Sequence, residues 1–125
     1  MKIFTEKQAG VIVNLSSLSA QRGGGLVGGT HYAASKGGVV SLTRAIAREF
    51  APKNIRPNVI CPAMIETSML DGLSEQQLND VISGIPLKRV GKTVELAGTC
   101  LFLASDLSGF ITGATIDVNG GIHIH

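Results

Sequence analysis

The stretch Gly10-Val11-Ile12-Val13-Asn14-Leu15-Ser16 is a run of β-branched and apolar residues bounded by glycine and serine. A run of this kind predicts a β-strand that is buried on both faces, as the strands of parallel sheets are. Residues 17–30 are rich in Gly and Ser and predict a loop. From about His31 to Phe50, apolar positions recur at three- and four-residue steps, which predicts an amphipathic helix after the strand.

The rest of the chain continues this alternation. Ile55 to Cys61 predicts a second strand, which Pro62 ends. Because Pro57 has no N–H to donate, it must lie where no neighbouring strand needs that hydrogen bond. The remaining predicted elements are a helix capped by Ser74 that reaches about Ser83, a helix from Thr93 to about Ala104, and a strand at Thr115–Val118. This order predicts an α/β fold with a parallel sheet, and its three strands are few enough to suggest that part of a domain is missing.

Composition and charge restrict the class of protein. The 125 residues allow a single domain, and 44% apolar with 16% charged residues is ordinary for a folded core. The net charge is +2 without a basic run, so neither a nucleic acid nor a membrane is expected as a partner. The longest apolar runs are far shorter than the ~20 residues that span a bilayer. Cys61 and Cys100 lack metal-ligand spacing, so we expect unpaired thiols, no metal site and a cytoplasmic location.

The segment Tyr32-Ala33-Ala34-Ser35-Lys36 carries the strongest chemical signal. Tyr and Lys four residues apart on a helix project from the same face. A lysine cation beside a phenol favours the phenolate form, which makes the tyrosine a better general acid/base near neutral pH. On spacing alone, the pair also fits a purely structural role on a helix surface.

Two serines, Ser16 and Ser17, stand where the first predicted strand ends. The carboxyl ends of the strands are where parallel sheets bind their ligands. A hydroxyl at this place can hydrogen-bond a substrate oxygen as charge develops on it.

These motifs and their surroundings resemble the short-chain dehydrogenase/reductase family. The resemblance begins at Asn14-Leu15-Ser16-Ser17, includes Tyr32 to Lys36, and ends at Val118-Asn119-Gly120-Gly121. Between these motifs it runs through residues 54–67, 86–91, 102–106 and 111–113, in order and at the family's intervals. The nearest subgroup resembles 3-oxoacyl-[acyl-carrier-protein] reductases and sugar or polyol dehydrogenases. The resemblance implies a Rossmann-type doubly wound parallel sheet, of which residues 1–125 would form the C-terminal half as a single partial domain.

The resemblance implies three catalytic residues. Tyr32 would be the acid/base that protonates or deprotonates the substrate oxygen. Lys36 would favour its phenolate form and hold the nicotinamide ribose. The catalytic serine of the family matches Ser17, with Ser16 as the alternative. The substrate implied is a small alcohol or ketone, covered by a mobile segment of about residues 66–89.

The resemblance also implies a nicotinamide cofactor, either NAD or NADP. Pro62 and Ile65 would line the nicotinamide, and Thr67 would reach its carboxamide or the pyrophosphate. Ala63 departs from the family pattern, which has glycine after this proline. The spacing of 15 residues from Ser17 to Tyr32 is longer than usual, so residues 22–29 are expected to bulge.

The largest departure concerns cofactor binding. The family's Gly-rich cofactor turn, its residue that selects NAD or NADP, its Asn-Ala-Gly stretch and its catalytic Asn have no counterpart in these 125 residues. Gly23-Gly24-Gly25-Leu26-Val27-Gly28 matches the letters of a dinucleotide fingerprint, but it does not directly follow a strand, and Glu49, the acid at the right distance, falls inside a helix. We therefore expect a loop beside the substrate pocket there. The N-terminal dinucleotide-binding half is expected to be absent from this chain.

Two functions from different classes follow. The first is NAD(P)-dependent hydride transfer between nicotinamide and a secondary alcohol or ketone, such as a 3-oxoacyl thioester, a sugar or a polyol. In this case the chain would be a truncated part of the enzyme and inactive by itself. The second is a catalytically inactive fragment that serves only as a self-associating α/β module. The apolar edge of the strand at residues 11–16 and the small-residue face of the 31–50 helix predict a homo-oligomer. His123 and His125 would make a poor zinc site without a third ligand and are interpreted as tail residues.

Overall fold

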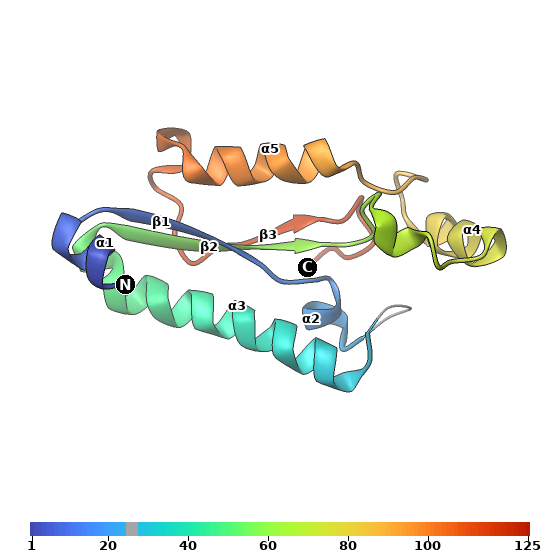
Figure 1. Cartoon of the computed structure of the whole chain (residues 1–125), viewed down its shortest axis with the longest axis horizontal. Coiled ribbons are helices and arrows are strands. Elements are labelled where there is room, and N and C mark those ends of the chain that lie inside the picture. Colours follow the sequence, from blue (N-terminus) through green and yellow to red (C-terminus); the bar gives the residue numbers. More distant parts are fainter. Residues whose placement is uncertain (25–27) are drawn as a thin grey trace.

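A computed structural model of the chain describes residues 1–24 and 28–125. Its centre is a parallel sheet in which β2 (Ile55–Pro62) lies between β1 (Gly10–Leu15) and β3 (Thr115–Val118). Figure 1 shows α3 (Thr30–Phe50) on one face of this sheet and α5 (Thr93–Ala104) on the other. The predicted α/β fold with a parallel sheet is therefore confirmed.

The shorter elements lie around this three-layer centre. They are α1 (Lys2–Lys7), α2 (Ser19–Arg22), α4 (Glu75–Gly84) and the 3₁₀ turns η1 (Ala51–Lys53), η2 (Ser68–Leu70) and η3 (Asp106–Ser108). The predicted cap of α4 is confirmed, because Ser74 Oγ accepts the backbone N–H of Gln77 at 3.2 Å while Gln77 Oε1 accepts the N–H of Ser74 at 2.9 Å. The expectation of a loop at 17–30 is wrong at α2, and residues 25–27 lie outside the described residues. None of the described helices is both long and apolar enough to cross a membrane.

The central strand β2 forms the core. Ile55, Val59, Ile60 and Cys61 have no accessible surface, since helices cover both of its faces and a strand lies on each side. Pro57 fits this position because the ladder to β3 begins only two residues later, at the pair of Val59 with Thr115. At Pro57 the neighbouring segment donates instead, from Gly113 N to Pro57 O at 2.7 Å. The prediction that no partner needs a proline N–H is confirmed.

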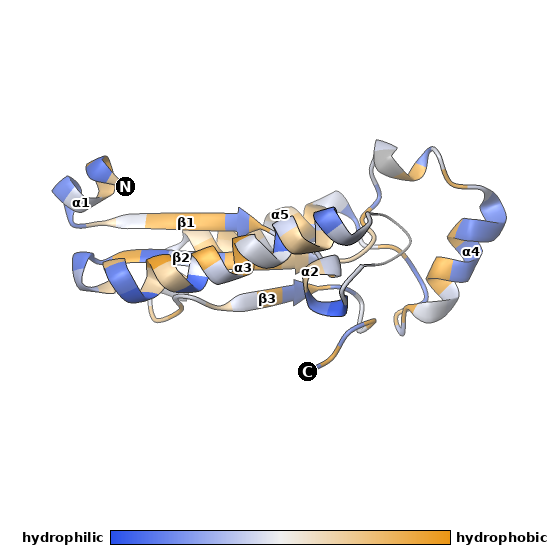
Figure 2. Ribbon diagram, turned by 90° about the horizontal axis from the view of Figure 1, so that it is seen from below, coloured by the Kyte–Doolittle hydropathy of each residue, from blue (hydrophilic) through white to orange (hydrophobic). Residues whose placement is uncertain are grey.

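The expectation that β1 is buried on both faces is wrong. Its residues from Gly10 to Asn14 are half-buried, and Leu15 is 48% exposed. β1 is partly exposed because it stands at an edge of the sheet, where within the described residues it pairs only with β2. Figure 2 shows this edge strand as a mostly apolar ribbon. Composition does not distinguish a buried central strand from an apolar strand whose second neighbour is absent.

A buried amide holds β2 against the segment that leads into β3. The side chain of Asn58 has no accessible surface. Its Nδ2 donates to Ile111 O at 3.1 Å, and its Oδ1 accepts the N–H of Ala114 at 3.0 Å. If this side chain were removed, Ala114 N–H would lose its partner, whereas Ile111 O would keep the hydrogen bond that it accepts from Arg56 Nη1 at 3.0 Å.

We therefore expect Asn58→Ala to lower the free energy of unfolding by about 2–4 kcal/mol, because a cavity and an unsatisfied backbone N–H at Ala114 remain. The measurement is urea unfolding followed by circular dichroism. Asn79→Ala, on the exposed surface of α4, is the control and should change stability by less than about 0.5 kcal/mol. Equal stability of the two variants would contradict the role given to Asn58.

Candidate active site

The carboxyl ends of the strands open into a cavity of about 350 Å³. Ser17 and α2 follow β1 on one side of it, and Tyr32 enters from the first turn of α3. Pro62, the last residue of β2, forms another part of the wall. Three of the six residues predicted to form the site therefore line one cavity, at the edge of the sheet where parallel α/β folds bind ligands.

The two serines after β1 are distinguished by their hydrogen bonds. Ser16 is 4% exposed, and its Oγ donates to the backbone carbonyl of Lys36 at 2.8 Å. This bond ties the end of β1 to α3. Ser17 lines the cavity, and its Oγ accepts the N–H of Ser19 at 3.1 Å. A hydroxyl that accepts one bond keeps its own proton for donation, so the geometry favours Ser17 over Ser16 for contact with a substrate.

Tyr32 and Lys36 lie on the same side of α3, as their spacing predicts. Lys36 Nζ is 5.8 Å from the centre of the Tyr32 ring. The same ammonium group donates to Leu15 O, at the end of β1, at 3.1 Å. Lys36 is not part of the cavity wall, so it acts on the cavity only through the tyrosine ring and the strand end beside it.

Gly28 is a positioning residue that sequence reasoning missed. Its φ is +88°, and a Cβ atom there would overlap the ring of Tyr32. The glycine is required both for the left-handed backbone and for the close approach of the ring. The signal in the sequence was the Gly28-Gly29 pair directly before the helix, but it was hidden among the other glycines of residues 23–29.

Ile65 and Thr67 lie beyond the cavity wall, on the segment that leads from β2 toward α4. Ile65 forms an isolated parallel bridge with Gly91. Because Met64 and Glu66 make the hydrogen bonds of this bridge, the peptide groups of Ile65 itself face away from Gly91. Thr67 Oγ1 lies 3.4 Å from Ile65 O, to which it donates. The structure therefore does not place these two residues beside Tyr32 and Ser17.

The two ends of the segment that carries α4 are tied together. Gly91 N donates to Met64 O at 3.0 Å, and Glu66 N donates to Gly91 O at 2.8 Å. A Cβ atom at Gly91 would lie only 2.7 Å from Ile65 Cδ1, so the isoleucine side chain packs directly on the glycine. Residues 66–90 thus leave the sheet after β2 and return to a point beside Met64 and Glu66. Figure 1 shows this segment extending beyond the strand ends.

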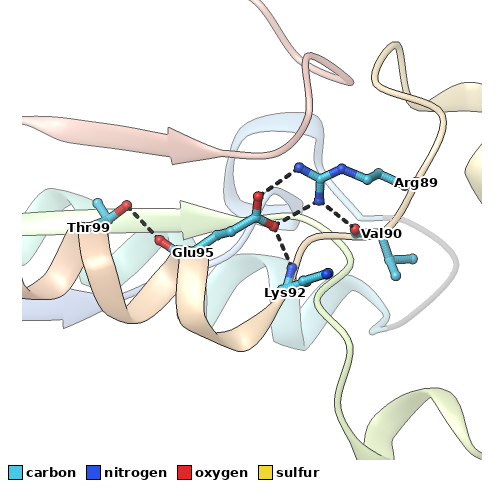
Figure 3. A network of polar contacts seen from close by, with 5 residues as sticks. All are labelled: Arg89, Val90, Lys92, Glu95 and Thr99. Carbon is cyan, nitrogen blue, oxygen red and sulfur yellow. Dashed lines mark hydrogen bonds and ion pairs between the residues drawn. The ribbon is translucent and has the colours of Figure 1, made fainter.

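An ion pair attaches the C-terminal end of this segment to α5, as Figure 3 shows. Arg89 donates from both terminal nitrogens to Glu95, at 2.7 and 2.8 Å. Glu95 Oε2 also accepts the N–H of Lys92 at 2.7 Å. The hydrogen bonds from Arg89 and from the Lys92 backbone lower the pKa of Glu95 from its ordinary 4.5 to about 2. One carboxylate therefore holds both the Arg89 side chain and the first turn of α5.

The lowered pKa of Glu95 gives a prediction with a definite sign. A carboxylate whose pKa is depressed in the folded state stabilises the fold above its ordinary pKa of 4.5, and this contribution disappears as pH falls through about 2. The ion pair should therefore persist at pH 3.5. Carboxyl carbon NMR should give Glu95 a pKa of about 2, and Arg89→Gln should move it upward toward 4.5. Arg48→Gln, on the exposed surface of α3, should leave it unchanged, and an ordinary Glu95 titration in the unaltered chain would contradict the pairing.

Several other residues line this cavity, and three of them come from different elements. Arg22 comes from the end of α2, Asp80 from α4 and Ile122 from the segment after β3. Nothing in their local sequence marks them, since only the fold brings them to one place. A larger cavity of about 580 Å³ lies between α5 and the end of β3 and contains none of the six predicted residues.

Of the two histidines in the tail, His125 lies beside β3. His125 Nδ1 lies 3.3 Å from Asp117 Oδ2 on β3. Among residues 1–24 and 28–125, no group of three or more His, Cys, Asp or Glu side chains is placed to hold a metal ion. The glycine-rich motif begins at Gly23, which caps the short helix α2 and so does not directly follow a strand. This position agrees with the interpretation that the motif is not a dinucleotide fingerprint. The part of that motif at residues 25–27 lies outside the described residues.

A parallel α/β sheet with Ser17 and Tyr32 at its carboxyl edge, and with Lys36 beside the tyrosine ring, defines a protein of Rossmann type. The comparisons agree, because the family model described as "Enoyl-(Acyl carrier protein) reductase" matches residues 1–123. The chain belongs to the short-chain dehydrogenase/reductase family and is similar to its 3-oxoacyl-[acyl-carrier-protein] reductases.

The relatives include oxidoreductases of different printed names. An uncharacterized short-chain type dehydrogenase/reductase of Sinorhizobium fredii is 53% identical over 117 residues, which are 93% of this chain and 46% of the relative. A 3-oxoacyl-[acyl-carrier-protein] reductase of Chlamydia muridarum is 44% identical over 115 residues, covering 92% of this chain and 46% of the relative. The crystal structure of a 3-oxoacyl-[acyl-carrier protein] reductase of Brucella melitensis superposes with a TM-score of 0.94 at 34% identity, covering 99% of this chain and 46% of that one. The chain thus spans about half the length of these relatives.

Proposed function

We propose that this chain supplies the catalytic part of a short-chain dehydrogenase that transfers hydride between nicotinamide and a secondary alcohol or ketone. The observation that carries the proposal is the cavity shared by Ser17, Tyr32 and Pro62, with Lys36 Nζ 5.8 Å from the centre of the tyrosine ring. The printed names of the relatives add support for a ketone substrate, since they include reductases of 3-oxoacyl and acetoacetyl thioesters.

Three side chains of this chain act on the oxygen atom of the substrate. In ketone reduction the Tyr32 hydroxyl gives its proton to the carbonyl oxygen, and in alcohol oxidation the phenolate takes the hydroxyl proton. The Ser17 hydroxyl donates a hydrogen bond to the same oxygen and stabilises the negative charge that develops on it. The Lys36 ammonium group stabilises the phenolate that Tyr32 becomes.

The residues at the carboxyl edge fit the nicotinamide end of NAD or NADP. Lys36 Nζ is an ammonium donor on the outer edge of β1, suited to the ribose hydroxyls. Pro62 offers an apolar wall, and the peptide groups of Ile65, which face away from Gly91, are suited to a carboxamide. The Thr67 hydroxyl donates to Ile65 O and can still accept a hydrogen bond from the carboxamide nitrogen. When bound, the cofactor supplies or accepts the hydride at the carbon that bears the substrate oxygen.

We further propose that residues 1–125 act as one partial domain and require the rest of the relatives' length for activity. The adenosine and pyrophosphate of a dinucleotide are held at a Gly-rich turn between a strand and a helix, and the described residues contain no such turn. Cys61 and Cys100 are free thiols, and burial raises the pKa of Cys61, which keeps it protonated and unreactive. Free thiols support the proposed cytoplasmic location.

The proposal is tested in a completed enzyme, made by joining residues 1–125 to the remaining half of the Sinorhizobium fredii relative. Tyr32→Phe should lower kcat at least about 100-fold with little change in cofactor affinity, because the variant loses general acid/base catalysis and keeps its ring. Ser17→Ala should lower kcat as well, while Ser41→Ala on the exposed surface of α3 should not. Full turnover by Tyr32→Phe would contradict the proposed chemistry.

The second part of the proposal concerns residues 1–125 alone. We expect neither micromolar binding of NADH or NADPH in calorimetric titration nor ketone-dependent oxidation of either cofactor. A loosely held cofactor loses much of the ~7–11 kcal/mol that exact positioning can contribute to catalysis. Micromolar binding with turnover would show that the other half is not needed.

A second candidate function is a self-associating α/β module, and a specific observation favours it. Large apolar side chains on and after α5 are exposed: Val94, Leu101, Leu107 and Phe110. The open edge of β1 adds unpaired backbone groups that can extend the sheet. Sedimentation of the chain should therefore show oligomers, and a stable folded monomer would count against this candidate.

A further inference from the structure

Arg22 is the cation in the wall of the catalytic cavity. It lies at the end of α2 and is exposed, and it lines the same cavity as Tyr32 and Ser17. Among the residues that the structure describes, none forms an ion pair or a side-chain hydrogen bond with it. A guanidinium group presents a planar fork of donors that matches the two oxygens of a carboxylate or phosphate.

Apart from the hydroxyls of Ser17, Ser19 and Tyr32, the described residues in the other walls of the cavity offer an oxyanion no side-chain donor. They are largely apolar, with Met64, Val81, Ile85 and Ile122 among them. The cavity also has one acidic residue, Asp80, whose Oδ1 accepts the amide of Gln76 at 2.8 Å. A negative group in this cavity is therefore attracted to the α2 side and repelled from the α4 side.

We propose that Arg22 selects substrates that carry an oxyanion, a carboxylate or a phosphate, a few atoms from the reacting carbon. The inference rests on the proposed function, because it takes Tyr32 and Ser17 as the groups that hold the reacting oxygen. Arg22 lies five residues after Ser17 and three after Ser19 in the same short helix. Arg22, Ser17 and Tyr32 line one cavity of about 350 Å³, so a single small molecule can bring its anionic group to Arg22 and its reacting oxygen to Tyr32 and Ser17.

The inference changes the expected substrate class. A neutral ketone or alcohol would leave Arg22 without a partner and gain only from the apolar wall. A hydroxy acid, an oxo acid or a phosphorylated polyol would place its charge at Arg22 and its hydroxyl or carbonyl oxygen at Tyr32 and Ser17. Carboxylate and phosphate share this chemistry, so both are tested.

The test uses the full 125-residue chain, labelled with nitrogen-15, at low salt. Two pairs of secondary alcohols that differ in charge are titrated: 3-hydroxybutanoate against its methyl ester, and glycerol 3-phosphate against glycerol. Binding is followed by the amide signals of Ser17, Tyr32 and Val81, which line the cavity. We expect at least one anion to bind about tenfold more tightly than its neutral counterpart, as a charge-assisted bidentate contact allows.

Three variants assign the effect to its residue. Arg22→Gln should remove the preference for the anion, whereas Arg48→Gln, which makes the same change of net charge on α3, should keep it. Asp80→Asn should tighten binding of the anion and leave that of the neutral compound unchanged, because it removes a like charge from the cavity. These three responses together distinguish a contact at Arg22 from a general effect of net charge.

The outcomes separate this inference from the proposed function. Preference for either anion supports it, and the tighter of the two identifies the substrate class. Equal binding of charged and neutral compounds, an unchanged preference in Arg22→Gln, or no binding of any of the four would overturn it. None of these results alters the expected loss of turnover in Tyr32→Phe of the completed enzyme, which tests the proposed function by itself.

Discussion

The parallel pairing of β2 with a strand on each side is the constraint on which the rest of the structure depends. Because β2 is fully buried along most of its length, its neighbours cannot slip without exposing Ile60 or breaking the ladder. The register that pairs Leu15 with Ile60 and Pro62 with Val118 brings the ends of all three strands to one edge. The cavity forms where these strands stop, so the site is a consequence of the packing of β2.

Short polar contacts then fix the side chains around that edge. The bond from Ser16 Oγ to Lys36 O sets the height of α3 relative to the end of β1, which places Tyr32 beside the cavity. Gly28 lets the ring of Tyr32 approach the preceding loop. On the other side, the bridge between Ile65 and Gly91 holds the base of the segment that carries α4. The site is thus held by contacts between segments that are far apart in the sequence.

Local sequence predicted most of the elements. The strand at Thr115–Val118, the capped α4 and the long α3 came from periodicity and capping residues, which are local properties. The burial of β1 was predicted wrongly, because an apolar strand has the same composition at an edge as in the centre of a sheet. Asp80 lies in the segment of residues 66–89 that the resemblance predicted to cover the substrate, but the local sequence marks neither Asp80 nor Arg22 individually, since only the fold brings α2 and α4 to one cavity. The resemblance to a family supplied the roles of Ser17, Tyr32 and Lys36, and the structure supplied the reason for choosing Ser17 over Ser16.

The central proposal is that this chain presents an open strand edge beside its candidate catalytic residues, and that the remaining length of the relatives supplies the strand that pairs there. Gly10 N donates to Asn54 O, directly before β2, and Ser16 N donates to Ile60 O, so strand periodicity turns the amides of Ile12 and Asn14 toward β2 and those of Val11 and Val13 toward the open edge. Amide hydrogen exchange measured by NMR in dilute solution tests this directly. The account predicts that Val11 and Val13 exchange at least about 100-fold faster than Ile12 and Asn14 in the chain alone, and that they become protected in the completed enzyme. Equal protection of all four amides in the monomeric chain, or continued fast exchange of Val11 and Val13 in the completed enzyme, would contradict it.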